Sequence, residues 1–143
     1  MTKVADILRS KGSGVETVKP GASVSEAVQL LADAGIGALV VSSDHHNVEG
    51  ILSERDIVRS LPRSSDLVSV VVSELMTAKV TTCSPDQTVD DLVRVMTTSR
   101  IRHVPVQKDG KLVGIVSIGD VVKVKLGDLE RERTQLHGYI SGR

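Results

Sequence analysis

The chain has 143 residues, of which 40% are hydrophobic, and its 18 basic and 18 acidic residues give a formal net charge of zero. This length suits one domain or two small domains in close contact. With no basic surplus, no Phe or Trp and one Tyr, the composition argues against a protein that binds nucleic acid through cationic patches and stacking aromatic side chains. A single cysteine excludes an internal disulfide and a cysteine-rich metal site.

The N-terminus lacks the basic region and apolar core of a signal peptide, and no apolar run approaches the roughly 18 residues that a membrane-spanning helix needs. We therefore expect a cytoplasmic protein with no membrane partner. The balanced charge still permits a small anionic ligand, because two or three local basic groups are enough to bind one.

The apolar pattern of the first half predicts a series of short helices and strands. We expect helices over residues 4–8, 24–34 and 53–61 and strands over residues 16–18, 36–41 and 48–52. Ser23 suits the N-cap of the middle helix and Gly35 suits its C-terminal end. That helix also carries apolar residues on one face at helical spacing.

The second half repeats this order. We expect a helix over residues 70–76, a strand over 80–82, a helix that Thr88 caps, strands over 101–106 and 112–116, and a long last helix. Pro85 stands 65 residues after Pro20, and Val106 stands the same distance after Val41. An internal repeat of this length predicts two copies of one β-α-β-β-α unit.

Neither unit is large enough to bury its sheet alone, so the predicted fold is α+β, with the two units packed sheet against sheet about a pseudo-twofold axis. The expected division is a first repeat over 1–65, a second over 66–127 and a helical tail over 128–143.

The tail carries an apolar stripe near heptad spacing, interrupted by Arg133. The stripe consists of Val122, Leu126, Leu129, Leu136 and Ile140. Two interpretations are open: the helix packs back on its own domain, or the tail forms a dimer contact. Gly127 weakens the middle of this helix and is a candidate position for a bend.

One motif marks the junction of the second strand with the following helix in each half. Residues 50–56 are Gly-Ile-Leu-Ser-Glu-Arg-Asp, and residues 114–120, 64 positions later, are Gly-Ile-Val-Ser-Ile-Gly-Asp. Ser-x-x-Asp is typical of a capping box. It also suits a nucleotide-binding corner, because a helix N-terminus attracts phosphate and a carboxylate accepts hydrogen bonds from a ribose diol. The apolar strand and the second copy favour the ligand interpretation.

These motifs, with Arg-His-Val-Pro-Val at residues 102–106, resemble the cystathionine-β-synthase (CBS) domain pair, or Bateman module, over essentially the whole chain. Met-Thr at 76–77 and the segments 35–41 and 136–140 are similar to those of small stand-alone bacterial members. The resemblance implies that the cleft binds an adenine nucleotide, most commonly AMP, ADP or ATP, and more rarely S-adenosylmethionine or NAD(H). It also implies a homodimer.

By this resemblance, Ser53 and Ser117 would lie near phosphate and Asp56 and Asp120 on ribose, with adenine against the neighbouring strands. Arg102 and His103 precede the second corner, so we expect the corner with Ser117 and Asp120 to be the better phosphate site. The small residues near Gly37 predict a roomier first side, suited to a larger ligand such as a dinucleotide. The full set of expected ligand-binding residues is Val18, Lys19, Gly37, Ala38, Ser53, Arg55, Asp56, Thr82, Arg102, His103, Val104, Pro105, Ser117, Gly119 and Asp120.

The function that these observations favour is a non-catalytic sensor that binds an adenine nucleotide, AMP before the others, and signals in trans to an effector protein. One alternative is an enzyme that acts on the bound nucleotide with His103 as its base. Another is a structural dimer with empty clefts. Asp44-His45-His46 lacks a third metal ligand at useful spacing, and Cys83 lacks a neighbouring base, so neither predicts a site.

Overall fold

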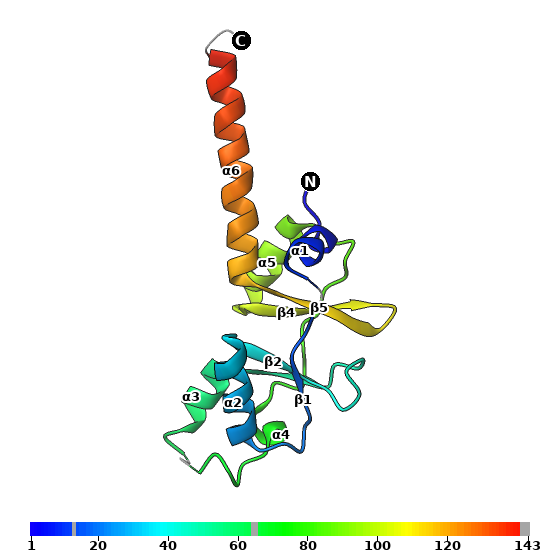
Figure 1. The fold of residues 1–143 in the computed structure, drawn as a ribbon, viewed down its shortest axis with the longest axis vertical. Helices are drawn as coiled ribbons and strands as arrows, with labels where there is room; N and C mark the ends of the chain where they lie inside the picture. The colour runs from blue at the N-terminus through cyan, green and yellow to red at the C-terminus, as the bar shows by residue number, and fades with distance from the viewer. Residues whose placement is uncertain (13, 64–65, 141–143) are drawn as a thin grey trace.

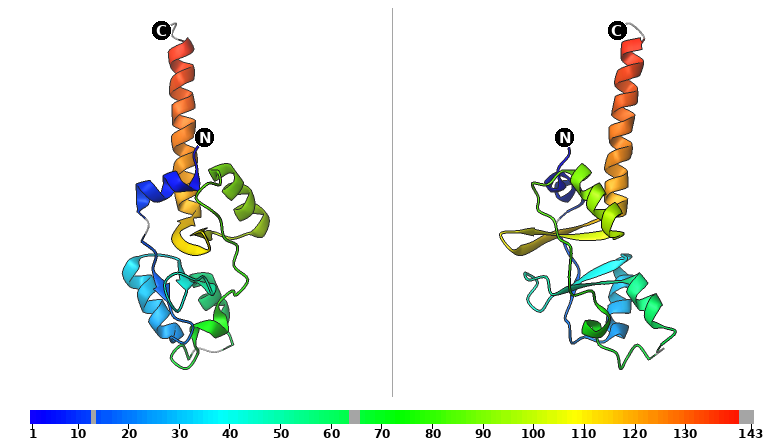
Figure 2. Two further views of the ribbon diagram at one scale, coloured as in Figure 1. Left: turned by 90° about the vertical axis from the view of Figure 1, so that its right-hand side faces the viewer. Right: turned by 180° about the vertical axis from the view of Figure 1, so that it is seen from behind.

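The computed structural model describes residues 1–12, 14–63 and 66–140 of the chain. Two small sheets lie one above the other, with helices on their outer faces and one long helix that projects away from the rest (Figure 1). Figure 2 shows the same stack from the side and from behind. The predicted α+β fold, two related units with a long C-terminal helix, is confirmed.

The first sheet has the strand order β1-β2-β3. β1 (Thr17–Val18) pairs in parallel with β2 (Ala38–Val41), and β2 pairs antiparallel with β3 (Gly50–Ser53). Every residue of β2 is buried, because α2 (Val24–Ala34) and α3 (Glu54–Ser60) lie on one side of this sheet and the second half lies on the other (Figure 1).

The second sheet is an antiparallel hairpin of β4 (His103–Lys108) and β5 (Lys111–Ser117). The strand predicted over residues 80–82 does not form. Its place is taken by a single parallel bridge between Cys83 and Val106.

The shortened ladder has a cause in the sequence. In the first sheet the N–H of Val40 donates to the carbonyl of Glu16 at 3.4 Å. The matching position in the second half is Pro105, which has no N–H to donate. The N–H of Cys83 donates to Pro105 (3.0 Å) and that of Gln107 to Cys83 (2.8 Å), and the ladder stops there.

The first helix of each half packs on the other half. Val4 and Ile7 of α1 (Val4–Lys11) belong to the core of the second half, whereas Val72 of α4 (Val72–Leu75) belongs to the core of the first. Backbone hydrogen bonds of 2.8–2.9 Å fix each helix to its exchanged position. The two halves of the sequence are therefore not the two packing units of the structure.

This exchange explains the glycine that opens each repeated motif. A Cβ added to Gly114 would lie 2.5 Å from Cδ2 of Leu8 in α1. A Cβ added to Gly50 would lie 2.5 Å from Sδ of Met76, which directly follows α4. Each glycine is buried and leaves space for the side chain of the exchanged helix.

Two further helices complete the fold, α5 (Val89–Ser99) and α6 (Ile118–Ile140). α6 begins at Ile118, directly after Ser117 of the second motif, and continues through Gly127. The other predicted elements are present with ends shifted by a few residues. In the described ranges no helix is long and apolar enough to cross a bilayer.

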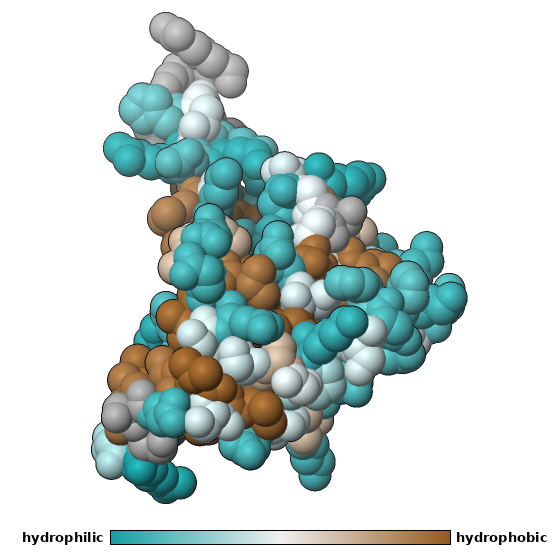
Figure 3. All heavy atoms as spheres, turned by 60° about the horizontal axis from the view of Figure 1, so that its bottom comes forward, coloured by the Kyte–Doolittle hydropathy of each residue, from teal (hydrophilic) through white to brown (hydrophobic). Residues whose placement is uncertain are grey.

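The outer surface is mostly hydrophilic, but Figure 3 shows apolar side chains gathered on the first half. The exposed large apolar side chains include Val58 of α3, Leu61 directly after it and Val68 further along the chain.

Candidate functional site

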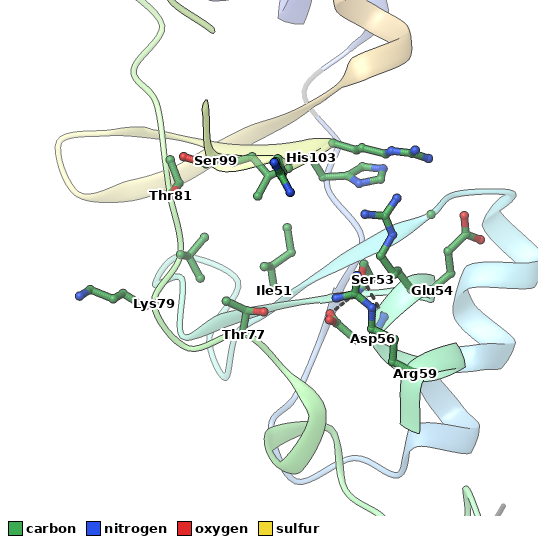
Figure 4. Close-up of a pocket in the computed structure, with 16 residues that line it drawn as sticks. Ile51, Ser53, Glu54, Asp56, Arg59, Thr77, Lys79, Thr81, Ser99 and His103 are labelled. Carbon is green, nitrogen blue, oxygen red and sulfur yellow. Dashed lines mark hydrogen bonds between the residues drawn. The ribbon is translucent and has the colours of Figure 1, made fainter. Parts of the chain in front are cut away.

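A cavity of about 570 Å³ opens between the two halves, beside the junction of β3 and α3 (Figure 4). Sites for small ligands commonly have volumes of about 300–1,000 Å³. The junction contributes Ser53, Glu54, Arg55, Asp56 and Arg59, the chain crossing between the halves contributes Thr77, Lys79, Val80 and Thr81, and the segment from α5 to β4 contributes Ser99, Arg100, Ile101, Arg102 and His103. Gly37 and Ile51 complete the lining.

The first corner, which is the junction of β3 and α3 at residues 53–56, contains the capping box that its sequence predicts. The N–H of Ser53 donates to Oδ2 of Asp56 at 2.9 Å, and the N–H of Asp56 donates to Oγ of Ser53 at 3.2 Å. Both residues are half-buried and line the cavity. The box uses Oδ2 of the carboxylate and not Oδ1, so capping and ligand binding are compatible roles.

The second corner contains the same box but carries an additional cation. The N–H of Ser117 donates to Asp120 at 2.9 Å, as in the first corner. Lys11, the last residue of α1, donates from Nζ to Oδ2 of Asp120 (2.7 Å) and to the carbonyl of Ile115 (2.9 Å). Burial acts to raise the pKa of Asp120, but the hydrogen bonds from Lys11 and Ser117 outweigh it and hold this pKa below its usual value.

Arg102 and His103 line the cavity of the first corner. His103 also pairs with Ser117 in the β4–β5 ladder, and the N–H of Ile118 donates to the carbonyl of Arg102 at 2.8 Å, so both residues lie between the two corners. Our expectation that they form a phosphate site with the second corner stays a prediction. The two sheets face each other, so the start of β4 lies opposite the end of β3 (Figure 4). The sequence motif could not reveal this pairing, because it carries no information about which half faces which corner.

Gly37 does not leave the open space that we expected. A Cβ at this position would lie 3.3 Å from Cε1 of His103 and 3.3 Å from Oε1 of Glu54. The glycine thus permits the close approach of an imidazole and a carboxylate. His103 and Glu54 therefore occupy the space directly beside Gly37, whereas the larger ligand that we expected on the first side stays a prediction.

The cavity lining is strongly basic. Its cationic residues are Arg55, Arg59, Lys79, Arg100 and Arg102, against the two carboxylates of Glu54 and Asp56, which gives a formal excess of three positive charges with His103 neutral. Burial lowers the pKa of His103; Glu54 and Asp120 act to raise it, and Lys11 and Arg102 act to lower it further. In its neutral form the imidazole can accept a hydrogen bond at one ring nitrogen and donate one at the other.

The other predicted residues do not line this cavity. Val18, Ala38, Val104 and Pro105 are core residues. Lys19 and Gly119 are exposed, and Thr82, Ser117 and Asp120 are half-buried. Their predicted roles remain predictions for a second site.

The predicted set of ligand-binding residues does not include Arg59, Lys79 or Arg100, although Arg100 shortly precedes Arg102 and His103 in the sequence. Arg59 follows Arg55 by four residues on α3, and this helical spacing puts both on one face. That signal was available in the sequence. Lys79 and Arg100 reach the cavity only because the chain crosses between the halves at this point, which the sequence alone does not disclose.

Two weaker sequence candidates have structural roles. The carboxylate of Asp44 accepts hydrogen bonds from the N–H groups of His46 and Asn47 and so organises a turn. Within residues 1–12, 14–63 and 66–140, no group of three His, Cys, Asp or Glu side chains is arranged to hold a metal. Cys83 is buried, and burial raises the pKa of its thiol to about 11.

Comparison with known proteins gives consistent matches. The model of the CBS domain matches residues 4–63 and again residues 72–127. The mitochondrial CBS domain-containing protein CBSX3 of Arabidopsis thaliana is 35% identical over 152 aligned positions, which cover 99% of this chain and 73% of that protein.

Two solved structures extend the comparison. The CBS-domain containing protein ATU1752 of Agrobacterium tumefaciens is 43% identical, with a TM-score of 0.83 over 87% of this chain and 99% of that one. The CBS domain pair of protein MJ0100, crystallised with 5′-methylthioadenosine and S-adenosyl-L-methionine, is 29% identical, with a TM-score of 0.80 over 90% of this chain and 98% of that one.

Proposed function

Because the chain belongs to the family of CBS-domain proteins, we propose that it is a regulatory module that binds an adenine nucleotide in the cavity beside Ser53 and Asp56. The observation that carries this proposal is the lining of the cavity. It combines a carboxylate of the kind that accepts hydrogen bonds from ribose hydroxyls with five cationic side chains. The module passes its occupancy to an effector protein and performs no chemistry on the nucleotide.

The charge of the lining favours nucleotides that carry phosphate. S-adenosylmethionine bears a sulfonium cation, which the positive excess of this cavity repels. AMP, ADP, ATP and NAD(H) bear the opposite charge, and each added phosphate can pair with a further arginine in a bidentate contact. We therefore rank ATP and ADP above AMP for this cavity, although the resemblance alone favours AMP.

The residues divide into two groups by the part of the nucleotide that they suit. Asp56 accepts hydrogen bonds from the ribose hydroxyls, as the acidic residue does in dinucleotide-binding folds. Arg55, Arg59 and Arg102 line the cavity from both halves and hold the phosphates. A ligand bound in this way bridges the two halves, because Arg102 and Asp56 come from different packing units.

A titration with a matched pair of variants tests this proposal. Calorimetry with AMP, ADP, ATP, NAD and S-adenosylmethionine should give measurable affinity for the phosphate-bearing ligands. Asp56→Asn keeps the side chain shape and removes the charge, so affinity should fall about 10- to 100-fold, the loss of a charged hydrogen bond or two. Asp120→Asn changes the equivalent residue of the second corner and should leave affinity for the cavity nearly unchanged.

Two results would contradict the proposal. One is that no nucleotide binds or raises the melting temperature at millimolar concentration, where a ligand at 100 times its Kd would add about 2.7 kcal/mol. The other is that Asp120→Asn, and not Asp56→Asn, abolishes binding. Product analysis after incubation with ATP and NAD checks the absence of chemistry, and turnover that His103→Ala abolishes would identify an enzyme instead.

A further inference from the structure

One side of α6 packs against its own domain, and the other side is exposed. Val121 is buried, Val124 packs against the core of the second half, and Lys125 forms an ion pair with Asp90 of α5. Beyond Lys125 the helix leaves the body of the molecule and projects alone (Figures 1 and 2). The projecting part spans about 22 Å at 1.5 Å per residue.

The exposed side carries an apolar stripe that only Arg133 interrupts. Its members are exposed to the following extents: Ile118 40%, Val122 48%, Leu126 56%, Leu129 60% and Leu136 61%. A run of large aliphatic side chains this exposed is uncommon on a monomer and marks an interaction surface. An isolated helix of this length also gains little stability in water without a packed apolar face.

The spacing of the stripe is that of a two-stranded coiled coil. Val122, Leu129 and Leu136 repeat every seven residues and take the d positions, and Leu126 and Arg133 take the a positions. These side chains lie on the exposed side of α6, so a partner helix can reach them without displacing the contacts that hold Val121 and Val124.

The position of Arg133 decides the orientation of the partner. In an antiparallel coiled coil, a residues face d residues, so every alignment would place Arg133 against an apolar d side chain of the other helix. In a parallel, in-register pair, a faces a, so each apolar layer meets its own counterpart and the arginines share one layer. A single polar a residue is a known device for fixing register in such pairs.

The flanking charges agree with the parallel alignment. Residues at g face residues at e of the next heptad in the partner. Lys125 at g then faces Glu130 of the partner copy, and the ammonium group can serve this carboxylate as well as Asp90 because it has three donors. Glu132 at g lies beside Arg133 of the partner copy and offsets the repulsion within that layer.

We propose that α6 of two copies of this chain form a parallel, two-stranded coiled coil in register over Val122 to Leu136. The occupant of the exposed stripe is therefore the same stripe of a second copy. The two bodies lie side by side at the same end of the coil, and this arrangement is independent of any nucleotide.

Single cysteine variants test the orientation directly. In the parallel pair, Val122→Cys and Leu136→Cys each bring two thiols together across the seam, so each variant should form a disulfide-linked dimer in high yield under mild oxidation. No antiparallel alignment of a with d residues brings both positions close to their own counterparts: where one of them lies within about 6 Å along the axis, the other is more than about 30 Å away, which is beyond disulfide reach. Arg131→Cys, on the outer face of the coil, is the matched control and should remain uncross-linked.

The unmodified chain is a second control, because its one cysteine, Cys83, is buried. Sedimentation equilibrium should give twice the chain mass of 15.2 kDa for the unmodified protein at tens of micromolar. Circular dichroism of each reduced variant verifies that it is folded. A mass of one chain would overturn the proposal, as would failure of either Val122→Cys or Leu136→Cys to cross-link while folded.

Discussion

Gly50 and Gly114 occupy equivalent positions in the two motifs, yet replacing each with Ala should have unequal effects. At Gly114 the three atoms nearest to the added Cβ all belong to the side chain of Leu8, its two methyl groups at 2.5 and 3.0 Å and Cγ at 3.3 Å. At Gly50 it meets Sδ of Met76 at 2.5 Å and also the backbone oxygen of Thr77 at 3.0 Å. The end of a leucine side chain can rotate away, but a backbone oxygen cannot.

Thr77 is held in place by two backbone hydrogen bonds with Ile51, of 2.9 and 3.0 Å. Overpacking of this kind costs about 1–3 kcal/mol, whereas replacing Gly with Ala in a strand returns about 0.5–1 kcal/mol. Gly50→Ala should therefore lower the free energy of unfolding by about 1–2 kcal/mol, and Gly114→Ala by less than about 0.5 kcal/mol.

Thermal and urea unfolding of the two variants measures the difference. A loss of about 1–2 kcal/mol corresponds to a fall in Tm of about 3–7 °C for a chain of this size, against less than about 2 °C for Gly114→Ala. Equal falls for the two variants, or a larger one for Gly114→Ala, would refute the argument that the fixed backbone oxygen decides the cost.

Two further predictions concern the charges at the corners. Lys11→Met removes the donor to Asp120 and should lower the free energy of unfolding by about 1–2 kcal/mol at pH 7. The contact holds the folded-state pKa of Asp120 below the unfolded value of about 3.9, so its contribution is present above that pH and is lost as the pH falls through the folded pKa. Urea unfolding should therefore show a smaller difference between the variant and the unmodified chain at pH 3 than at pH 7. The folded-state pKa of His103 is lowered in the free protein, and a bound phosphate favours the protonated ring. The affinity for ATP, measured by calorimetry, should therefore rise several-fold as the pH falls from 7 to 5.5. If the affinity of His103→Asn shows the same dependence on pH, this histidine is not the cause.

The repeat, the order of the elements and the capped corners could be predicted from the sequence, because each depends on local spacing. The offset of 65 residues between Pro20 and Pro85 is visible in the printed chain. Ser53 and Asp56 form their box within a single turn, so no distant contact is needed to predict it.

The pairing of the corners could not be predicted in the same way. An apolar stripe on residues 4–8 shows that a helix buries one face, but it does not show which sheet covers that face. Lys11 reaches Asp120 across 109 positions of sequence only because α1 packs on the second half. The preference that we gave to the second corner was based on Arg102 and His103 alone. In the structure they adjoin Ser117 in the β4–β5 ladder and also line the cavity with Ser53 and Asp56, and the sequence discloses only the first of these contacts.

The exchanged helices have a consequence for how the molecule unfolds. Neither half can lose its sheet packing without uncovering residues that belong to the other, since Val4 completes one core and Val72 completes the other. A chain that consists of two repeats in sequence therefore unfolds as one cooperative unit. Cutting the chain between the repeats would yield two pieces, each of which carries the helix that completes the core of the other. The stable state of the two pieces is therefore the reassembled pair.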